Sequence, residues 1–235
     1  HNDAGDLEAK LAGRKTGDRL VLSDGVFSMD GDIADAAGLV RACEHHDAML
    51  MLDDAHGFGV LGALGRGTPE HLGIPTGAVP VYMATLGKAL GTAGAFIAGS
   101  EDLIETLIQQ ARTYVYTTAA PPAVAEAARA GLALVRSQPQ LRERLAGNID
   151  YFRRCCAQAG IDITDSRTAI QPLIIGDTQA AVDMSEKLLE NGILITAIRP
   201  PTVPEGTARL RITLSAAHSH AQIDKLVAAL DASRP

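Results

Sequence analysis

Val-Tyr-Met-Ala-Thr-Leu-Gly-Lys-Ala-Leu-Gly-Thr-Ala-Gly-Ala-Phe-Ile-Ala, residues 81–98, is the stretch most informative about the fold. It opens with a short apolar run after Pro80, which predicts a buried strand, and it closes with a second apolar run over 93–98. Between the runs lies a glycine-rich turn with one lysine, Lys88, and with the hydroxyl of Thr85 three residues before it. A lysine between two buried strands is costly unless its charge is paired or lost. A Schiff base with an aldehyde removes that charge, although on this stretch alone a solvated loop lysine is the simpler interpretation.

A second stretch, Met-Leu-Met-Leu-Asp-Asp-Ala-His-Gly at 49–57, favours the chemical interpretation. Its apolar part predicts another buried strand, and open α/β sheets place ligand chemistry at strand ends. Asp53 can keep a pyridine nitrogen protonated, and the imidazole of His56 can meet the oxygen or the face of the same ring. Asp54 is the competing carboxylate, but strand alternation points it to the opposite face. The alternative is an Asp-rich turn that contains a histidine by chance. The glycine-rich turn with Lys88 after the next strand makes this alternative less favoured.

The order of elements indicates an α/β fold with a mostly parallel sheet. A strand over 19–26, a helix capped by Asp32 and a strand over 49–53 form a β-α-β unit, which favours parallel strands with crossover helices. The apolar stripe of that helix is Ile33, Ala36, Ala37, Val40 and Cys43. Residues 57–67 contain five glycines but lack the Gly-Lys-Ser/Thr ending of a phosphate loop, so we interpret them as a close-packed turn.

The pattern of predicted helices and strands changes near residue 136. This change predicts a large domain over 1–135 and a small α+β domain over 136–235. Within the first we expect a helix capped by Ser100 with Leu103, Leu107 and Ala111 inward, a short strand over 114–117, and a helix opened by Pro121-Pro122. Within the second we expect a helix after Gln138-Pro139, strands over 170–175, 193–198 and 209–214, a helix over 177–191, and a last helix opened by the capping box Ser219-x-x-Gln222.

Composition excludes several classes of protein. The 235 residues are 46% hydrophobic and 3% aromatic, so one or two domains can bury a sizeable core rich in aliphatic side chains. A net charge of −7 argues against a nucleic-acid surface, and no apolar run reaches membrane-spanning length. The three cysteines, two of them adjacent, suit a reducing cytoplasm. His45-His46 and His218-Ser-His220 have no acidic or thiol partner at metal-ligand spacing, so we predict no metal site.

Five ordered motifs resemble those of the α-oxoamine synthases, which are fold-type I enzymes dependent on pyridoxal 5'-phosphate (PLP). The motifs are Ser-Asp-Gly-Val-Phe-Ser-Met-Asp-Gly-Asp (23–32), Asp-Asp-Ala-His-Gly (53–57), Thr-Leu-Gly-Lys (85–88), Tyr-Thr-Thr-Ala-Ala-Pro-Pro (116–122) and Arg-Pro-Pro-Thr-Val-Pro-Glu-Gly-Thr-Ala-Arg-Leu-Arg-Ile-Thr (199–213). The resemblance covers essentially the whole chain. It also implies that an N-terminal portion of the large domain, with further cofactor and substrate residues, precedes His1 in the family.

The resemblance implies a role for each matching residue. Lys88 matches the lysine that holds PLP, Asp53 the partner of the pyridine nitrogen, and His56 the partner of the ring oxygen. The remaining matches are cofactor contacts from Ser28 and Thr85, cross-subunit phosphate contacts from Thr117 and Thr118 in a homodimer, a contact of Thr202 with the acyl substrate, and a contact of Arg211 with the amino-acid carboxylate. For Arg199 we slightly prefer a surface or salt-bridge role, and for the two threonines plain strand propensity is the alternative.

Within the family, residues 199–204 and 169–177 resemble the biotin-pathway branch, which condenses L-alanine with a pimeloyl thioester and releases CO2 and the free thiol. The thiol carrier, CoA or a carrier protein, stays open. So do the branches that use glycine or serine, a different PLP reaction such as aminotransfer, and a non-catalytic scaffold subunit or fragment. The presence of Lys88 counts against a scaffold subunit, which we expect to lack it.

Overall fold

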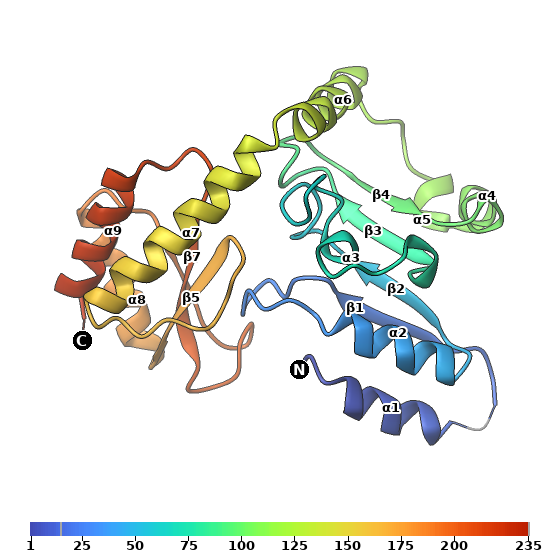
Figure 1. The fold of residues 1–235 in the computed structure, drawn as a ribbon, viewed down its shortest axis with the longest axis horizontal. Helices are drawn as coiled ribbons and strands as arrows, with labels where there is room; N and C mark the ends of the chain where they lie inside the picture. Colours follow the sequence, from blue (N-terminus) through green and yellow to red (C-terminus); the bar gives the residue numbers. More distant parts are fainter. Residues whose placement is uncertain (15, 235) are drawn as a thin grey trace. The chain divides into compact units, whose positions relative to one another are not determined.

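The computed structural model describes residues 1–14 and 16–234, which divide into two compact units. Unit 1 comprises residues 1–26 and 33–139, and unit 2 comprises residues 27–32 and 140–235 (Figure 1). The short segment 27–32 therefore leaves unit 1 directly after the first strand and belongs with the C-terminal part of the chain. The domains expected over 1–135 and 136–235 stay a prediction. In the described residues, no helix combines the length and the apolar character needed to cross a membrane.

Unit 1 is built on a four-stranded sheet in the order β1-β2-β3-β4. Its strands are β1 (Leu20–Asp24), β2 (Met49–Asp53), β3 (Val81–Thr85) and β4 (Ala95–Ala98). The first three run parallel, whereas β4 turns back and pairs antiparallel with β3. The carboxyl ends of three strands consequently meet at one edge, which is where ligand chemistry collects in sheets of this kind.

The two faces of this sheet differ in cover. On one face Val21, Leu50, Leu52 and Ala84 are buried, as strand alternation requires for a packed side. On the other face Leu20, Leu22 and Met49 keep 57%, 66% and 47% of their surface exposed. The helices of unit 1 are α1 (Ala4–Ala12), α2 (Ala36–His45), α3 (Thr68–His71), the 3-10 turn Thr76–Ala78, α4 (Glu101–Gln110), α5 (Arg112–Val115) and α6 (Pro122–Ser137).

Two local predictions in unit 1 are wrong, one in the start of a helix and the other in the type of an element. The cap of α2 is Asp35, whose side chain accepts a hydrogen bond from the Gly38 amide, rather than Asp32. Ile33 cannot join the helix because it bridges Val26 in extended conformation. Residues 112–115 form the helical turn α5 rather than a strand over 114–117, since their amides bond to carbonyls three or four residues back.

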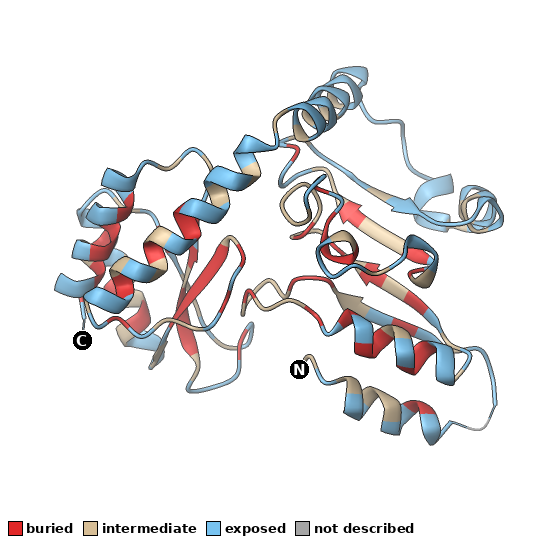
Figure 2. Ribbon diagram, in the orientation of Figure 1, coloured by how far each residue is buried: buried red, intermediate tan, exposed pale blue. Residues whose placement is uncertain are grey.

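Two predicted burials in unit 1 also fail. The run over 93–98 does form β4, but three of its four residues are exposed, so Lys88 does not lie between two buried strands. Helix α4 is capped by Ser100 as expected, yet Leu103 and Leu107 are only half-buried and no residue of α4 is buried. Figure 2 shows the same pattern, with α4 and α6 in the colours of exposed and half-buried residues and without buried residues.

Unit 2 packs three helices on a three-stranded antiparallel sheet in the order β5-β7-β6. Its strands are β5 (Ile170–Gly176), β6 (Thr196–Ile198) and β7 (Ala208–Thr213), and its helices are α7 (Gln140–Gln158), α8 (Thr178–Glu190) and α9 (His220–Ala232). The predicted capping box of Ser219 and Gln222 opens α9. Phe152, Leu188, Leu210 and Leu230 are fully enclosed at the centre of one apolar core, which appears red in Figure 2.

Candidate active site

The carboxyl ends of β1, β2 and β3 bring polar side chains together in unit 1. Asp24 and Asp53 are register partners at the ends of adjacent parallel strands, and Asp53 is in turn the partner of Met83. Thr85 follows Met83 by two residues and therefore lies on the same face of the sheet. We call Asp24, Asp53, His56, Thr85 and Lys88 the carboxyl-edge cluster.

Lys88 and His56 lie in contact although 32 residues separate them. The Lys88 Nζ atom is 3.0 Å from the His56 Nε2 atom. Lys88 occupies the exposed turn after β3, and His56 the half-buried turn after β2. An amine beside an imidazole at the end of a sheet is a pair that can exchange a proton with a bound substrate.

The two adjacent carboxylates have separate tasks. Asp54 is fully buried, and its carboxylate accepts hydrogen bonds from the Thr68 amide at 2.7 Å, the Thr68 hydroxyl at 2.6 Å and the Tyr82 hydroxyl at 2.8 Å. Asp53 is half-buried. Its Oδ1 atom accepts a hydrogen bond from the nearby Ala55 amide at 3.0 Å. The expectation that the two side chains point to opposite faces is thus confirmed, and Asp53 is the carboxylate of the cluster.

The buried carboxylate also explains the glycine-rich segment over 57–67. A Cβ atom on Gly57 or on Gly67 would collide with the Asp54 carboxylate, and Gly67 has a φ of 90°, which favours glycine. Burial raises the pKa of Asp54, and the hydrogen bonds from Thr68 oppose that shift. The segment is therefore a close-packed turn wrapped around one carboxylate, as the sequence predicts.

Asp24 is a member of the cluster that motif reasoning left without a role. Burial raises the pKa of its carboxyl group, the nearby charge of Asp53 raises it further, and the Lys88 ammonium lowers it. The signal available in the sequence was its position at the end of the strand beside Asp53, within the quoted motif 23–32.

The predicted threonines differ in their surroundings. The Thr85 hydroxyl donates to the Gly94 carbonyl at 3.0 Å and accepts from the Gly87 amide at 3.2 Å, so it shapes the turn that carries Lys88. Thr117 and Thr118 are exposed and follow α5 in the connection to α6. The explanation of these two residues by strand propensity does not apply, because they are not in a strand.

In unit 2 the segment 27–32 is held by two arginines of β7. Arg209 Nη1 donates to Asp30 Oδ1 at 2.6 Å, and Arg211 Nε donates to the Ser28 carbonyl at 2.6 Å. Arg209 is only 5% exposed, whereas Arg211 is partly open, and burial lowers the pKa of Arg211. The buried side chains of Leu210, Ile212 and Leu214 confirm the predicted alternation along this strand.

Ser28 and Thr202 contribute backbone contacts in unit 2. The Ser28 carbonyl, rather than the Ser28 hydroxyl, accepts the hydrogen bond from Arg211. Thr202 is exposed, and its amide donates to the Arg199 carbonyl at 3.1 Å in a turn. Arg199 is exposed as well. The cofactor and substrate roles of these residues stay predictions.

Comparison with known proteins gives the family. Residues 1–230 match the family described as aminotransferase class I and II. The chain belongs to this family. It is 58% identical over 234 residues to the 8-amino-7-oxononanoate synthase of Thioalkalivibrio sulfidiphilus, which covers 99% of this chain and 60% of the relative. The chain thus spans about 60% of the length of the curated relatives it matches.

Solved structures confirm the fold. A structure of SPT, a serine palmitoyltransferase, with a PLP internal aldimine has a TM-score of 0.94 and 31% identity, covering 99% of this chain and 59% of that one. A crystal structure of 8-amino-7-oxononanoate synthase from Francisella tularensis has a TM-score of 0.85 and 30% identity, covering 99% of this chain and 66% of that one. The fold is therefore that of the PLP-dependent transferases of fold type I, and the chain is similar over nearly its whole length to enzymes of the α-oxoamine synthase group.

Proposed function

We propose that this chain belongs to an 8-amino-7-oxononanoate synthase of biotin biosynthesis. The reaction is the PLP-dependent condensation of L-alanine with a pimeloyl thioester to 8-amino-7-oxononanoate, CO2 and the free thiol. The observation that carries the proposal is the 3.0 Å approach of the Lys88 amine to His56 beside Asp53. Identities of 54–60% to curated synthases of this name support the choice of substrates.

The donor set of the carboxyl-edge cluster fits PLP. Lys88 offers the primary amine that an aldehyde requires, Asp53 offers a carboxylate for a protonated pyridine nitrogen, and His56 offers an imidazole for the ring oxygen. The hydrogen bonds of Asp54 to Thr68 and Tyr82 keep the neighbouring carboxylate out of this set. When bound, PLP supplies the electron sink that stabilises negative charge at the substrate Cα.

The residues of the chain then hold the reactants and move the proton. Lys88 would hold the cofactor and, once displaced, take the Cα proton of L-alanine as a general base. Asp53 would keep the proton on the ring nitrogen, and His56 would orient both the ring oxygen and the Lys88 amine. Arg211 would take the amino-acid carboxylate, since the bond from its Nε to Ser28 fixes the plane of the guanidinium. Thr202 would lie against the acyl chain.

The same proposal includes a homodimer in the cytoplasm. Thr117 and Thr118 are exposed, which suits a contact with the cofactor phosphate of a second subunit. Tyr114 and Tyr116, beside them, are 61% and 80% exposed, and apolar surface of this kind is typical of protein interfaces. Replacing both threonines by alanine should weaken PLP binding more than it affects the fold, as measured by PLP titration and circular dichroism. A monomer with full activity in light scattering would refute the shared site.

The reaction is tested by supplying the purified protein with PLP, L-alanine and pimeloyl-CoA and measuring both CO2 and free thiol. Equal amounts of the two products are expected, and Lys88→Ala should abolish both. A higher kcat/KM for glycine or serine with another acyl-CoA would move the assignment to another branch of the family. Amino transfer to a keto acid without CO2 release would contradict the condensation itself.

A further inference from the structure

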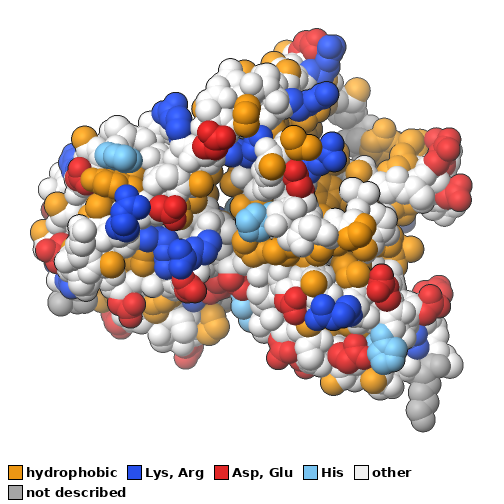
Figure 3. All heavy atoms as spheres, viewed as in Figure 1, with side chains coloured by type: hydrophobic (Ala, Val, Ile, Leu, Met, Phe, Trp, Pro, Cys, Tyr) orange, Lys and Arg blue, Asp and Glu red, His pale blue; other side chains and the backbone are white. Residues whose placement is uncertain are grey.

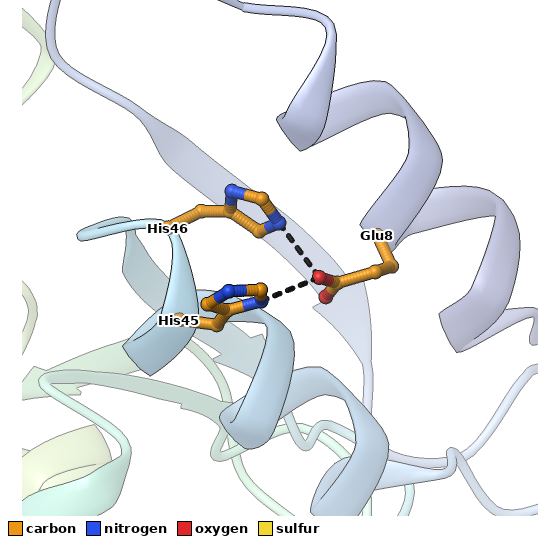
Figure 4. A group of neighbouring side chains, drawn as sticks. All are labelled: Glu8, His45 and His46. Carbon is orange, nitrogen blue, oxygen red and sulfur yellow. Dashed lines mark hydrogen bonds and ion pairs between the residues drawn. The ribbon is translucent and has the colours of Figure 1, made fainter.

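A cluster of metal-ligating side chains lies in unit 1 away from the carboxyl-edge cluster. Glu8 of α1 points at two consecutive histidines at the end of α2 (Figure 4). Its Oε1 atom is 2.7 Å from the Nδ1 atom of His45 and 2.7 Å from the Nε2 atom of His46. Local sequence spacing provides no carboxylate partner for His45 and His46. In the structure that partner is Glu8, which lies 37 residues before His45.

The fold holds these three residues together for local reasons. Helix α2 ends at His45, and His46 is its C-cap, so the two rings leave the helix end side by side with centroids 4.5 Å apart. Helix α1 is fixed near its start by Asn2, whose side chain donates to the Ile33 carbonyl and accepts from the Asp35 amide, both at 2.9 Å. This anchor positions Glu8, about one and a half turns further on, opposite the two rings.

We propose that Glu8, His45 and His46 form a binding site for a divalent transition metal of the Zn²⁺ type. Two imidazoles and one carboxylate are a ligand set that Zn²⁺ uses when it keeps a fourth, open position for water. All three ligand atoms lie within 4.8 Å of one another. Binding replaces the two hydrogen bonds. The ring of His45 then presents a lone pair at Nδ1 and that of His46 at Nε2, while any proton on these atoms moves to the other ring nitrogen or to solvent.

The site requires only a small rearrangement. With metal–ligand bonds of about 2.0–2.1 Å, tetrahedral ligand atoms stand roughly 3.3 Å apart, so Glu8 Oε1 must withdraw slightly from both nitrogens. The side chains of Glu8 and His45 are 40% and 73% exposed and can make this adjustment. The side chain of His46 is 14% exposed and provides the fixed ligand.

The position of the site indicates a structural role. The ligands lie at the end of α2, from which the chain enters β2 at Met49, whereas Asp53 stands at the opposite end of the same strand. Five residues of strand span about 16 Å, which is too far for direct participation in chemistry at Lys88. A bound ion would instead clamp α1 to α2.

The proposal is tested by titrating Zn²⁺ into the purified protein, stripped of metal and saturated with PLP, in competition with a chromophoric chelator. The variants are His45→Ala and Glu8→Gln, which change exposed side chains and should fold. The matched control is His71→Ala, an exposed histidine at the end of α3. We expect one Zn²⁺ equivalent whose affinity falls at least about 10- to 100-fold in both variants but not in the control, because loss of supporting groups alone has that effect.

Two further measurements distinguish a metal site from a cluster held by hydrogen bonds alone. Zn²⁺ should raise the melting temperature of the wild type and of His71→Ala but not of the two variants. Co²⁺ in place of Zn²⁺ should give the absorption bands of a four-coordinate ion, and these should disappear in His45→Ala. Equal Zn²⁺ affinity in the wild type and both variants, or a melting temperature that Zn²⁺ does not change, would overturn the proposal.

Discussion

The two units hold themselves together in different ways. Unit 2 encloses Phe152, Leu188 and Leu210 in a single apolar core between its sheet and its helices. Unit 1 buries one face of its sheet, encloses the carboxylate of Asp54 in hydrogen bonds, and leaves Leu20 and Leu22 of the other face exposed. Hydrophobic side chains also gather at the surface of unit 1 around α5 and β4 (Figure 3). Among the described residues, most of the exposed large apolar side chains lie in unit 1, and exposed apolar surface of this kind is typical of protein interfaces.

The largest difference should appear in stability. Phe152→Ala removes a fully buried ring and should lower the free energy of unfolding of unit 2 by about 3–5 kcal/mol. Leu22→Ala removes a side chain that is 66% exposed, so it should change the free energy of unfolding of unit 1 by less than about 0.5 kcal/mol in the monomer. Hydrogen exchange under native conditions, followed at the amides of Leu210 and Leu50, measures each unit separately. Equal losses for the two substitutions would remove the contrast between the cores.

The next difference lies between the two arginines of unit 2. Arg211→Ala removes a charged hydrogen-bonding group worth about 1.5–3 kcal/mol, so the KM for L-alanine should rise roughly 10- to 100-fold while Lys88 still binds PLP. Arg209 is more deeply buried in its ion pair with Asp30, and Arg209→Ala should lower stability more and the alanine KM less. Steady-state kinetics and thermal unfolding of both variants measure the two effects. An unchanged alanine KM in Arg211→Ala would place the carboxylate site elsewhere, with Arg199 as the next residue to test.

The smallest expected effect is a pH dependence in unit 1. The folded-state pKa of Asp24 is raised, first by burial and then by Asp53, so its stabilising contribution is present at low pH and is lost as the pH rises through the raised value. Relative to Asp24→Asn, the wild type should therefore lose stability over the acidic range, as the pH rises above about 4, the ordinary pKa of an aspartate carboxyl group. Denaturant titrations of both proteins across this range measure the difference. A relative gain in stability with rising pH would show that the Lys88 charge dominates over burial.

The sequence allowed the sheet of unit 1 and its edge to be predicted because the signals there are local. Apolar runs that end in Asp53 and Thr85 mark two strand ends, and parallel pairing brings such ends together. The alternation of Arg209 to Leu214 likewise places the arginines and the core leucines on opposite faces, as the structure confirms. Strand alternation also distinguishes Asp53 from Asp54, because consecutive side chains of a strand point to opposite faces of the sheet.

The features that local patterns missed depend on distant partners. The segment 114–117 has strand propensity, but its first two residues belong to the helical turn α5 and it joins neither described sheet, so tertiary context overrides the propensity. The contact of Glu8 with His45 and His46 joins two helices, and spacing within one motif contains no sign of it. Asp24 gains its role from the neighbouring strand, which a motif read along the chain does not include.

The most direct test of the account is to trap PLP on the protein with borohydride and to map the pyridoxyl adduct by mass spectrometry. If the carboxyl-edge cluster of unit 1 is the cofactor site, one adduct should form on Lys88, and Lys88→Ala should leave no specific adduct. Asp53→Asn should weaken PLP binding or shift its absorption, whereas Leu22→Ala should not. A dominant adduct on Lys187 or Lys225 of unit 2, with Lys88 unmodified, would contradict the account.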